Sequence, residues 1–97
     1  MHLHAHEKVL LDRRRQGKTQ IAAARKHHVT RGTYIGWETG TVRCPRVPVV
    51  RGLSLGERCF ILRRRAGMTQ RDIAARLERS LRWVRMMETG LAPATEL

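Results

Sequence analysis

The chain has little of what disulfide-stabilised and membrane-spanning proteins need. Its 97 residues include two cysteines, three prolines, two tryptophans, one tyrosine and one phenylalanine. Cys44 and Cys59 are too few for a disulfide framework, and such a pair is usually free in a reducing cytosol. The longest apolar runs, residues 21–24 and 47–50, are far shorter than a signal peptide or a membrane span requires. The sequence therefore predicts a cytoplasmic protein without membrane contact.

Motifs for catalysis and for metal binding are also lacking. The sequence has no glycine-rich phosphate loop, no Gly-x-Ser-x-Gly and no pair of carboxylates in an apolar setting. His2, His4 and His6 alternate, and His27 is followed by His28, but no cysteine or carboxylate completes a known metal-ligand spacing. We therefore expect no enzyme, no metal, no cofactor and no small-molecule ligand.

Acidic residues are few relative to basic ones. Twenty lysines and arginines against eight aspartates and glutamates give a formal net charge of +12 and a pI near 11.6. A surplus of this size is typical of proteins that bind nucleic acid, so we expect a polyanionic partner. A basic but passive surface is the alternative. A membrane surface is a weaker one, because the arginines do not lie opposite a broad apolar face.

The most informative feature that is present is an internal repeat. Residues 7–40 recur as residues 57–90, displaced by fifty positions without a gap and with eleven identities. The identities include an arginine triplet, a Thr-Gln pair and a final Glu-Thr-Gly; in the first copy these are Arg13, Arg14, Arg15, Thr19, Gln20, Glu38, Thr39 and Gly40. A repeat of this period indicates one supersecondary unit present in two copies.

The unit begins with a helix, which is easiest to recognise in the second copy. Leu55, Cys59 and Leu62 fall at helical spacing and predict its inward face. Gly67 follows as a residue that can end a helix in the left-handed conformation.

Two further short helices follow in the same copy. Thr69 is a good N-cap, and Asp72 three residues later completes an approximate capping box. Ser80 is the N-cap of a third helix that ends near Gly90. The side chains expected to point inward are Ile73, Ala74, Leu77, Val84 and Met87. A first helix that braces two short helices joined by a tight turn is the helix-turn-helix outline.

The spacing within this outline is that of a known family. Counted from the Gln of Thr-Gln, an apolar residue and Ala follow at three and four, Ser or Thr at ten, an apolar residue at fourteen, Glu at eighteen and Gly at twenty. This pattern resembles the Cro/C1-type helix-turn-helix of phage repressors. The first copy departs from it at Asp12, Ala23 and His27, where core residues are usual. The second departs at Arg79 in the turn, and both copies lack the two helices that normally follow.

The resemblance implies a sequence-specific protein for double-stranded DNA that regulates transcription, of the kind phages use as immunity repressors. Such a protein would act in the host cytoplasm or nucleoid by occupying promoters. An antitoxin-like or antirepressor interaction module remains an alternative, as does a structured-RNA binder. RNA recognition would favour exposed aromatic side chains, and Trp83 alone is a candidate. Self-association is left open.

The repeat also predicts the organisation of the chain. We expect a first unit over residues 3–40, an extended connector over 41–53 with Pro45 and Pro48, a second unit over 54–90 and a tail over 91–97. A unit of roughly 35 residues lies below the size of about 40 that normally folds alone. The expected fold is therefore all-α, with two three-helix units packed as one compact pseudo-two-fold domain in which each copy covers the other's open apolar side.

Base readout is predicted from the two third helices. At 100° per residue, Val84 and Met87 share one side of the helix, and Arg82 and Arg85 lie on the other. Because Arg can hold guanine O6 and N7 bidentately, these two arginines are predicted to read bases. A solvated face is the alternative.

The corresponding face of the first copy has little hydrogen-bonding reach. Tyr34 and Trp37 are expected to point inward, and Arg31 and Thr33 at the margins are its candidates for base contact. This face carries two glycines, Gly32 and Gly36. Either the helix frays there, or the smooth surface allows close approach of a backbone or a partner helix.

Backbone contact is predicted from the starts of the second and third helices, where free N–H groups and the helix dipole favour phosphate. By the resemblance, the Gln of each Thr-Gln pair has the position that reaches toward the DNA backbone. The candidates are Thr19, Gln20, Thr30, Thr69, Gln70 and Ser80. Glu38 and Glu88 are expected to be structural and to pair with Arg13 or Arg63 of their own unit.

The connector offers one more candidate. Arg43, Arg46 and Arg51 among two prolines are typical of an arm that enters a narrow minor groove. A linker that only maintains solubility is the alternative.

Overall fold

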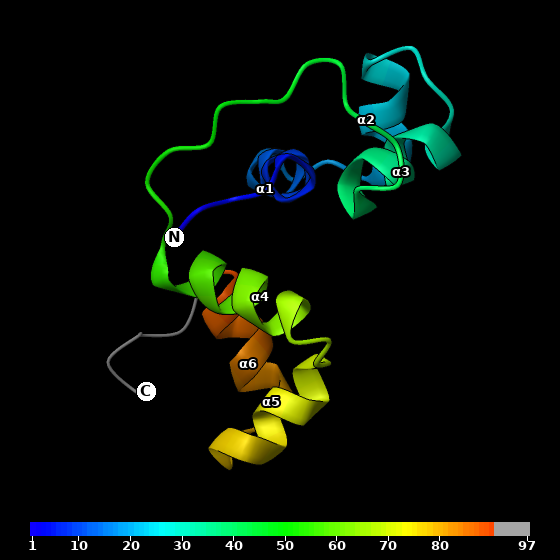
Figure 1. Cartoon of the computed structure of the whole chain (residues 1–97). Coiled ribbons are helices and arrows are strands. Elements are labelled where there is room, and N and C mark those ends of the chain that lie inside the picture. Colours follow the sequence, from blue (N-terminus) through cyan, green and yellow to red (C-terminus); the bar gives the residue numbers. More distant parts are fainter. Residues whose placement is uncertain (91–97) are drawn as a thin grey trace. The chain divides into compact units, whose positions relative to one another are not determined.

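The computed structural model describes residues 1–90, and within them the chain is helical with no strand (Figure 1). The helices are α1 (Ala5–Gln16), α2 (Gln20–Lys26), α3 (Arg31–Thr39), α4 (Leu55–Arg65), α5 (Gln70–Leu77) and α6 (Leu81–Glu88). The expected all-α class is confirmed for this part of the chain. The predicted tail, residues 91–97, lies outside the described residues.

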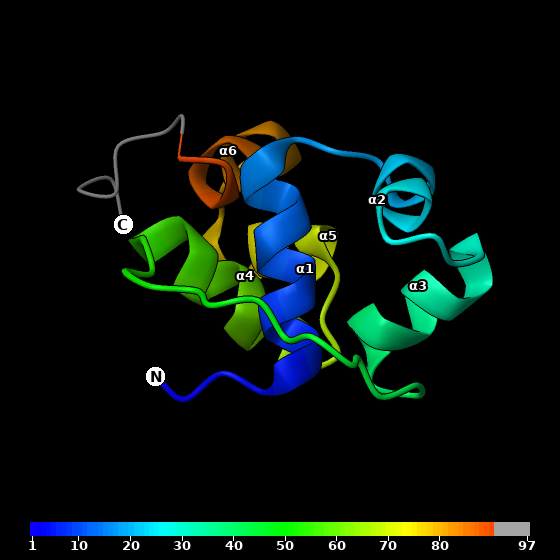
Figure 2. The same cartoon turned by 90° about the horizontal axis from the view of Figure 1, so that it is seen from above.

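The chain divides into two compact units, Met1–Arg51 and Gly52–Leu97. We call them the first unit, with α1 to α3, and the second unit, with α4 to α6. In each one the third helix packs against both the first and the second helix of the same unit, as the two views of the chain show (Figures 1 and 2). The expected packing of the units into one pseudo-two-fold domain stays a prediction.

Local capping sets where the helices begin. The hydroxyl of Thr69 accepts a hydrogen bond from the Asp72 N–H at 3.1 Å, and the Asp72 carboxylate accepts one from the Thr69 N–H at 2.8 Å. The predicted capping box of α5 is therefore confirmed. Ser80 caps α6 by accepting from the Trp83 N–H at 3.0 Å. Gly67 follows Ala66, the C-cap of α4, and has a φ of +69°, as expected of a residue that ends a helix.

The first unit is built around aromatic side chains from α3. Tyr34 and Trp37 are buried, as predicted. They pack with apolar residues of α1 and α2, namely Val9, Ala23 and Ala24. Cys44, from the segment after α3, packs on the same cluster. The aromatic rings thus supply the volume that Ala23 does not.

Gly36 allows the segment after α3 to lie close to that helix. The N–H of Val42 donates to the Gly36 carbonyl at 3.1 Å, and a Cβ on Gly36 would lie 2.5 Å from Val42 Cγ2. Of the two interpretations of this glycine, close approach is the one the structure supports, and the approaching backbone belongs to the same unit. Gly32 is exposed, with nothing within 4 Å of such a Cβ.

The inward face predicted for α4 is wrong. Leu55 and Leu62 are 45% and 53% exposed, whereas Phe60 and Ile61 are buried together with Gly56. Both sets of residues obey helical spacing, so periodicity alone could not choose between adjacent faces. The choice is made by Gly56, which has no side chain and lets the backbone at the end of α6 approach α4 closely.

The prediction for one side chain of α5 is wrong as well. Leu77 is 44% exposed, although Ala74, Val84 and Met87 are buried as expected. Leu77 is the last residue of α5, where the helix leaves the small core. Leu62, Leu77 and the half-buried Cys59 instead line an open apolar groove of about 390 Å³ within the second unit.

Candidate nucleic-acid interface

A buried polar network ties the first helix to the third in both units. In the second unit, Arg63 donates from Nε and Nη2 to the two carboxylate oxygens of Glu88, at 2.7 and 3.1 Å. Its Nη1 also donates to the Met68 carbonyl at 3.0 Å. The first unit repeats this arrangement with Arg13 and Glu38. The predicted structural pairing of both glutamates is confirmed.

The glutamines at the start of α2 and α5 join the same networks. Gln70 Nε2 donates to Glu88 Oε1 at 3.1 Å, and Gln20 Nε2 donates to Glu38 Oε1 at the same distance. Each glutamine is therefore held at the N-terminus of its helix by a glutamate that is only 3% exposed. The same amide nitrogen carries a second N–H that can donate to another acceptor.

In the first unit, candidates from two helix starts meet in one polar hollow. This hollow of about 480 Å³ is lined by Thr19, Gln20 and Arg31, together with Arg13 and Ile21. Its chemistry is that of an anion site, with hydrogen-bond donors and guanidinium groups on one surface.

Thr30 and Thr33 form a cap at the start of α3. The Thr30 hydroxyl accepts from the Thr33 N–H at 3.2 Å and donates to the Thr33 hydroxyl at 3.0 Å. Thr30 is exposed and Thr33 half-buried. The cap holds the first turn of α3, where Arg31 lies, in a defined position.

In the second unit, α6 exposes its predicted readers. Arg82 and Arg85 are exposed, and Val84 on the opposite side is fully buried. Arg85 Nε donates to Gln70 Oε1 at 3.3 Å, so a predicted base contact and a predicted backbone contact lie side by side. Nearby, the Arg79 guanidinium lies 5.0 Å from the centre of the half-buried Trp83 ring. Arg79 thereby covers the one aromatic that an RNA-binding role would use.

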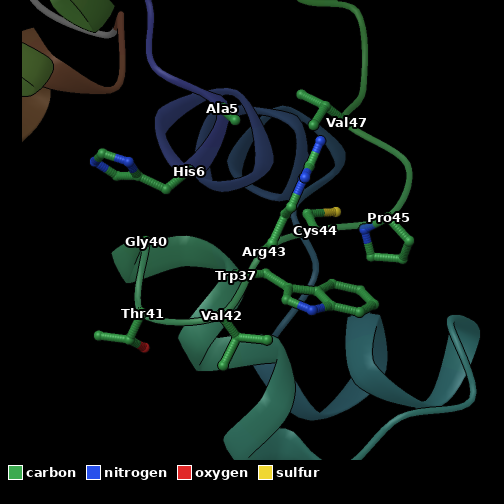
Figure 3. A pocket seen from close by; sticks show the side chains of 10 residues that line it. All are labelled: Ala5, His6, Trp37, Gly40, Thr41, Val42, Arg43, Cys44, Pro45 and Val47. Carbon is green, nitrogen blue, oxygen red and sulfur yellow. The ribbon is translucent and has the colours of Figure 1, made fainter.

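The connector arginines lie near their own unit. Arg43 lines an open pocket of about 810 Å³ between the start of α1 and the segment after α3, with His6 and Trp37 (Figure 3). The sulfur of Cys44 donates to the Arg46 carbonyl at 3.3 Å. The Arg51 carbonyl accepts from Arg15 Nη1 at 2.9 Å. None of these contacts gathers the three arginines with the helix starts, and the minor-groove arm stays a prediction.

Two basic features were missed by the sequence analysis. Arg71 is exposed in the first turn of α5, directly after Gln70, and only that adjacency could have indicated it. Lys18 and Lys26 lie close together on the first unit, and a hydrogen bond to Lys26 lowers the pKa of Lys18. A positive charge on one of these lysines disfavours a positive charge on the other, so this surface too favours an anionic partner.

Other classes of site find no support within residues 1–90. No group of three or more histidine, cysteine, aspartate or glutamate residues there could hold a metal ion. None of the described helices combines the length and the apolar character needed to cross a membrane. Comparison with known proteins finds no matching family model, no matching curated protein and no matching solved structure.

Proposed function

We propose that the protein binds double-stranded DNA sequence-specifically and regulates transcription, as a phage-type immunity repressor that acts by promoter occupancy. The observation that carries the proposal is the exposed pair of arginines on α6, Arg82 and Arg85, beside Gln70 at the start of α5. An arginine on an exposed helix face is suited to a major groove, and a helix start is suited to a phosphate.

Charge supports the same proposal. A net charge of +12 favours a polyanion, and the polar hollow at Thr19, Gln20 and Arg31 adds a second place where a phosphate fits. The role as a repressor, rather than as an activator, rests on the resemblance to the Cro/C1-type helix-turn-helix alone. Location in the cytoplasm or nucleoid belongs to the proposal.

The direct test is selection of bound duplexes from a random pool, followed by affinity measurements on the enriched site. With about 6 to 10 phosphate contacts, affinity should fall by about 10³ to 10⁵ between 50 and 200 mM salt. Arg82→Ala should weaken the binding free energy for the preferred site by about 1 to 3 kcal/mol and reduce the preference for the base that Arg82 contacts. Absence of any enriched duplex, or a flat response to salt, contradicts the proposal.

A second candidate function is an antitoxin-like or antirepressor interaction module. The open apolar groove of the second unit favours it, because Leu62 and Leu77 are both about half exposed there. Leu77→Ser separates the candidates. This change should leave DNA selection and salt dependence intact if DNA is the partner, since neither Arg82 nor Arg85 lines the groove.

A further inference from the structure

The two units have the same buried network, but they differ at the position of the third helix that in the second unit lies beside the glutamine of that network. In the first unit the position that corresponds to Arg85 is occupied by Ile35, which has no side-chain hydrogen-bond donor. Gln20 donates to Glu38 and Gln70 donates to Glu88 in the same way. The two glutamines differ because Gln70 also accepts a hydrogen bond from Arg85.

Taking the proposed DNA-binding function as given, we propose that Gln70 is a positioning residue for Arg85, and that base readout consequently resides in the second unit while the first unit contributes mainly backbone contacts. The proposal makes the two copies functionally unequal although they share their network residues.

The orientation of the Gln70 amide follows from the buried carboxylate. Glu88 can only accept, so Gln70 must turn its nitrogen toward Glu88 Oε1, 3.1 Å away. This leaves Oε1 of the same amide facing outward as an acceptor, and Arg85 Nε donates to it. Glu88 is itself held by Arg63 through two hydrogen bonds. Contacts through Gln70 thus link the buried Glu88, which Arg63 also holds, to the exposed Arg85.

The contact through Nε has a consequence for recognition. An exposed arginine carries about 2 kcal/mol of side-chain rotamer entropy, part of which is lost on binding. Holding Arg85 by its Nε restricts the side chain before DNA arrives, and it leaves both Nη groups to donate to guanine O6 and N7. Pre-organisation of this kind favours the guanine complex over complexes with other bases, because only guanine offers both acceptors.

The bond itself can be tested without DNA. Side-chain Nε–H signals of the full chain, labelled with ¹⁵N, report hydrogen exchange at each arginine, and Arg85→Lys identifies the signal of Arg85. We expect slow exchange for Arg85 in the wild-type chain and faster exchange in Gln70→Ala. Unchanged exchange in Gln70→Ala overturns the positioning role.

The consequence for readout is tested on the selected duplex and on a duplex in which the preferred guanine is replaced. Arg85→Ala should lower the affinity ratio of the two duplexes by about 5- to 100-fold. Gln70→Ala should lower the same ratio by a smaller factor, and the double variant should be no less selective than Arg85→Ala alone. Additive losses in the double variant contradict the proposal.

Gln20→Ala is the matched control, since it breaks the same bond to a glutamate in a unit without the arginine. It should weaken binding to both duplexes and leave their ratio unchanged. Arg85→Lys keeps the charge and the contacts among Arg63, Glu88 and Gln70, so we expect it to lower the ratio without disturbing the buried network. If the wild-type chain prefers no duplex, the proposed function fails and base readout with it, while the exchange measurement still decides whether Gln70 holds Arg85.

Discussion

The residues shared by the two copies are mainly polar, and they include the three side chains that make the buried network of each unit. Arg, Gln and Glu of the network are identical in both units, whereas Tyr34 and Trp37 of the first core correspond to Val84 and Met87 of the second. Apolar packing tolerates exchange as long as volume is filled, but a buried carboxylate needs specific donors. In this chain the polar network is the part that both units keep, and the apolar side chains that fill the core differ between them.

Removing one partner of the network should therefore be costly. Arg63→Ala leaves the carboxylate of Glu88, which is 3% exposed, without its bidentate partner. We expect a loss of about 3 to 5 kcal/mol in the free energy of unfolding, measured by urea denaturation. Arg71→Ala, which removes the same charge from an exposed position, should stay within about 0.5 kcal/mol. Equal effects of the two changes contradict a structural role for the pair.

Part of this network could be predicted from the sequence and part could not. The pairing of Arg13 with Glu38, and of Arg63 with Glu88, was predicted because both residues recur at the same separation in each copy. The contact between Gln70 and Arg85 was not, because it depends on how α5 and α6 cross. That angle is set by packing and leaves no local signal in the sequence.

At the scale of elements, helix starts were predicted well and helix faces were not. A cap such as Thr69 acts within four residues, so its hydrogen bonds are encoded locally. The buried face of α4 depends on what packs against it, and the deciding residue, Gly56, has no side chain to indicate burial. Leu62 and Leu77 were predicted to be buried for the same reason. Their spacing is helical, but they do not lie on the face of the helix that is buried.

The glycines give a test of these close approaches. Gly56→Ala would place a Cβ against the backbone carbonyl of Met87, which cannot yield, and we expect a loss of about 1 to 3 kcal/mol in thermal unfolding. Gly32→Ala meets nothing within 4 Å and should stabilise the protein by about 0.5 kcal/mol, because alanine loses less backbone entropy in a helix. Stabilisation by both changes would show that α4 and α6 do not approach as described.

The capping box of α5 gives a pH dependence. Hydrogen bonds from Thr69 lower the pKa of Asp72, so its contribution to stability is present above the ordinary carboxyl range and is lost as the pH falls below about 4. We expect Asp72→Asn, which can accept the same bond without titrating, to lose less stability between pH about 5 and 2 than the wild-type chain does. Glu78→Gln lies outside the capping box and should follow the wild-type profile, as measured by circular dichroism at each pH.

At the scale of the whole molecule, the question is whether the two copies unfold together as one cooperative unit or separately as two. The three helices of each unit span roughly 35 residues, below the size of about 40 at which folding alone usually needs disulfides, metals or association. Both cysteines are free, and no metal-binding group occurs within residues 1–90. Leu62 and Leu77 are also left about half exposed in the second unit. Mutual stabilisation of the two copies, which the sequence predicts, can be tested by unfolding.

We therefore expect the full chain to unfold in one transition. Trp37→Ala removes a side chain that is 7% exposed from the core of the first unit and should cost about 3 to 5 kcal/mol, enough to unfold the whole chain. Loss of the first unit then also removes the helicity of the second. The measurement is thermal unfolding by circular dichroism, with Val49→Ala, which alters an exposed connector residue, as the control.

A fragment over residues 53–97 provides the complementary measurement, because it keeps the Arg63, Glu88 and Gln70 network but lacks the first copy. If the copies depend on each other, this fragment is largely unfolded in circular dichroism and binds duplex DNA weakly. A fragment that melts cooperatively and binds with the affinity of the full chain instead means two independently folding units. Base readout through Arg85 then needs only the second unit, and the first unit is dispensable for binding, which also contradicts its proposed backbone contacts.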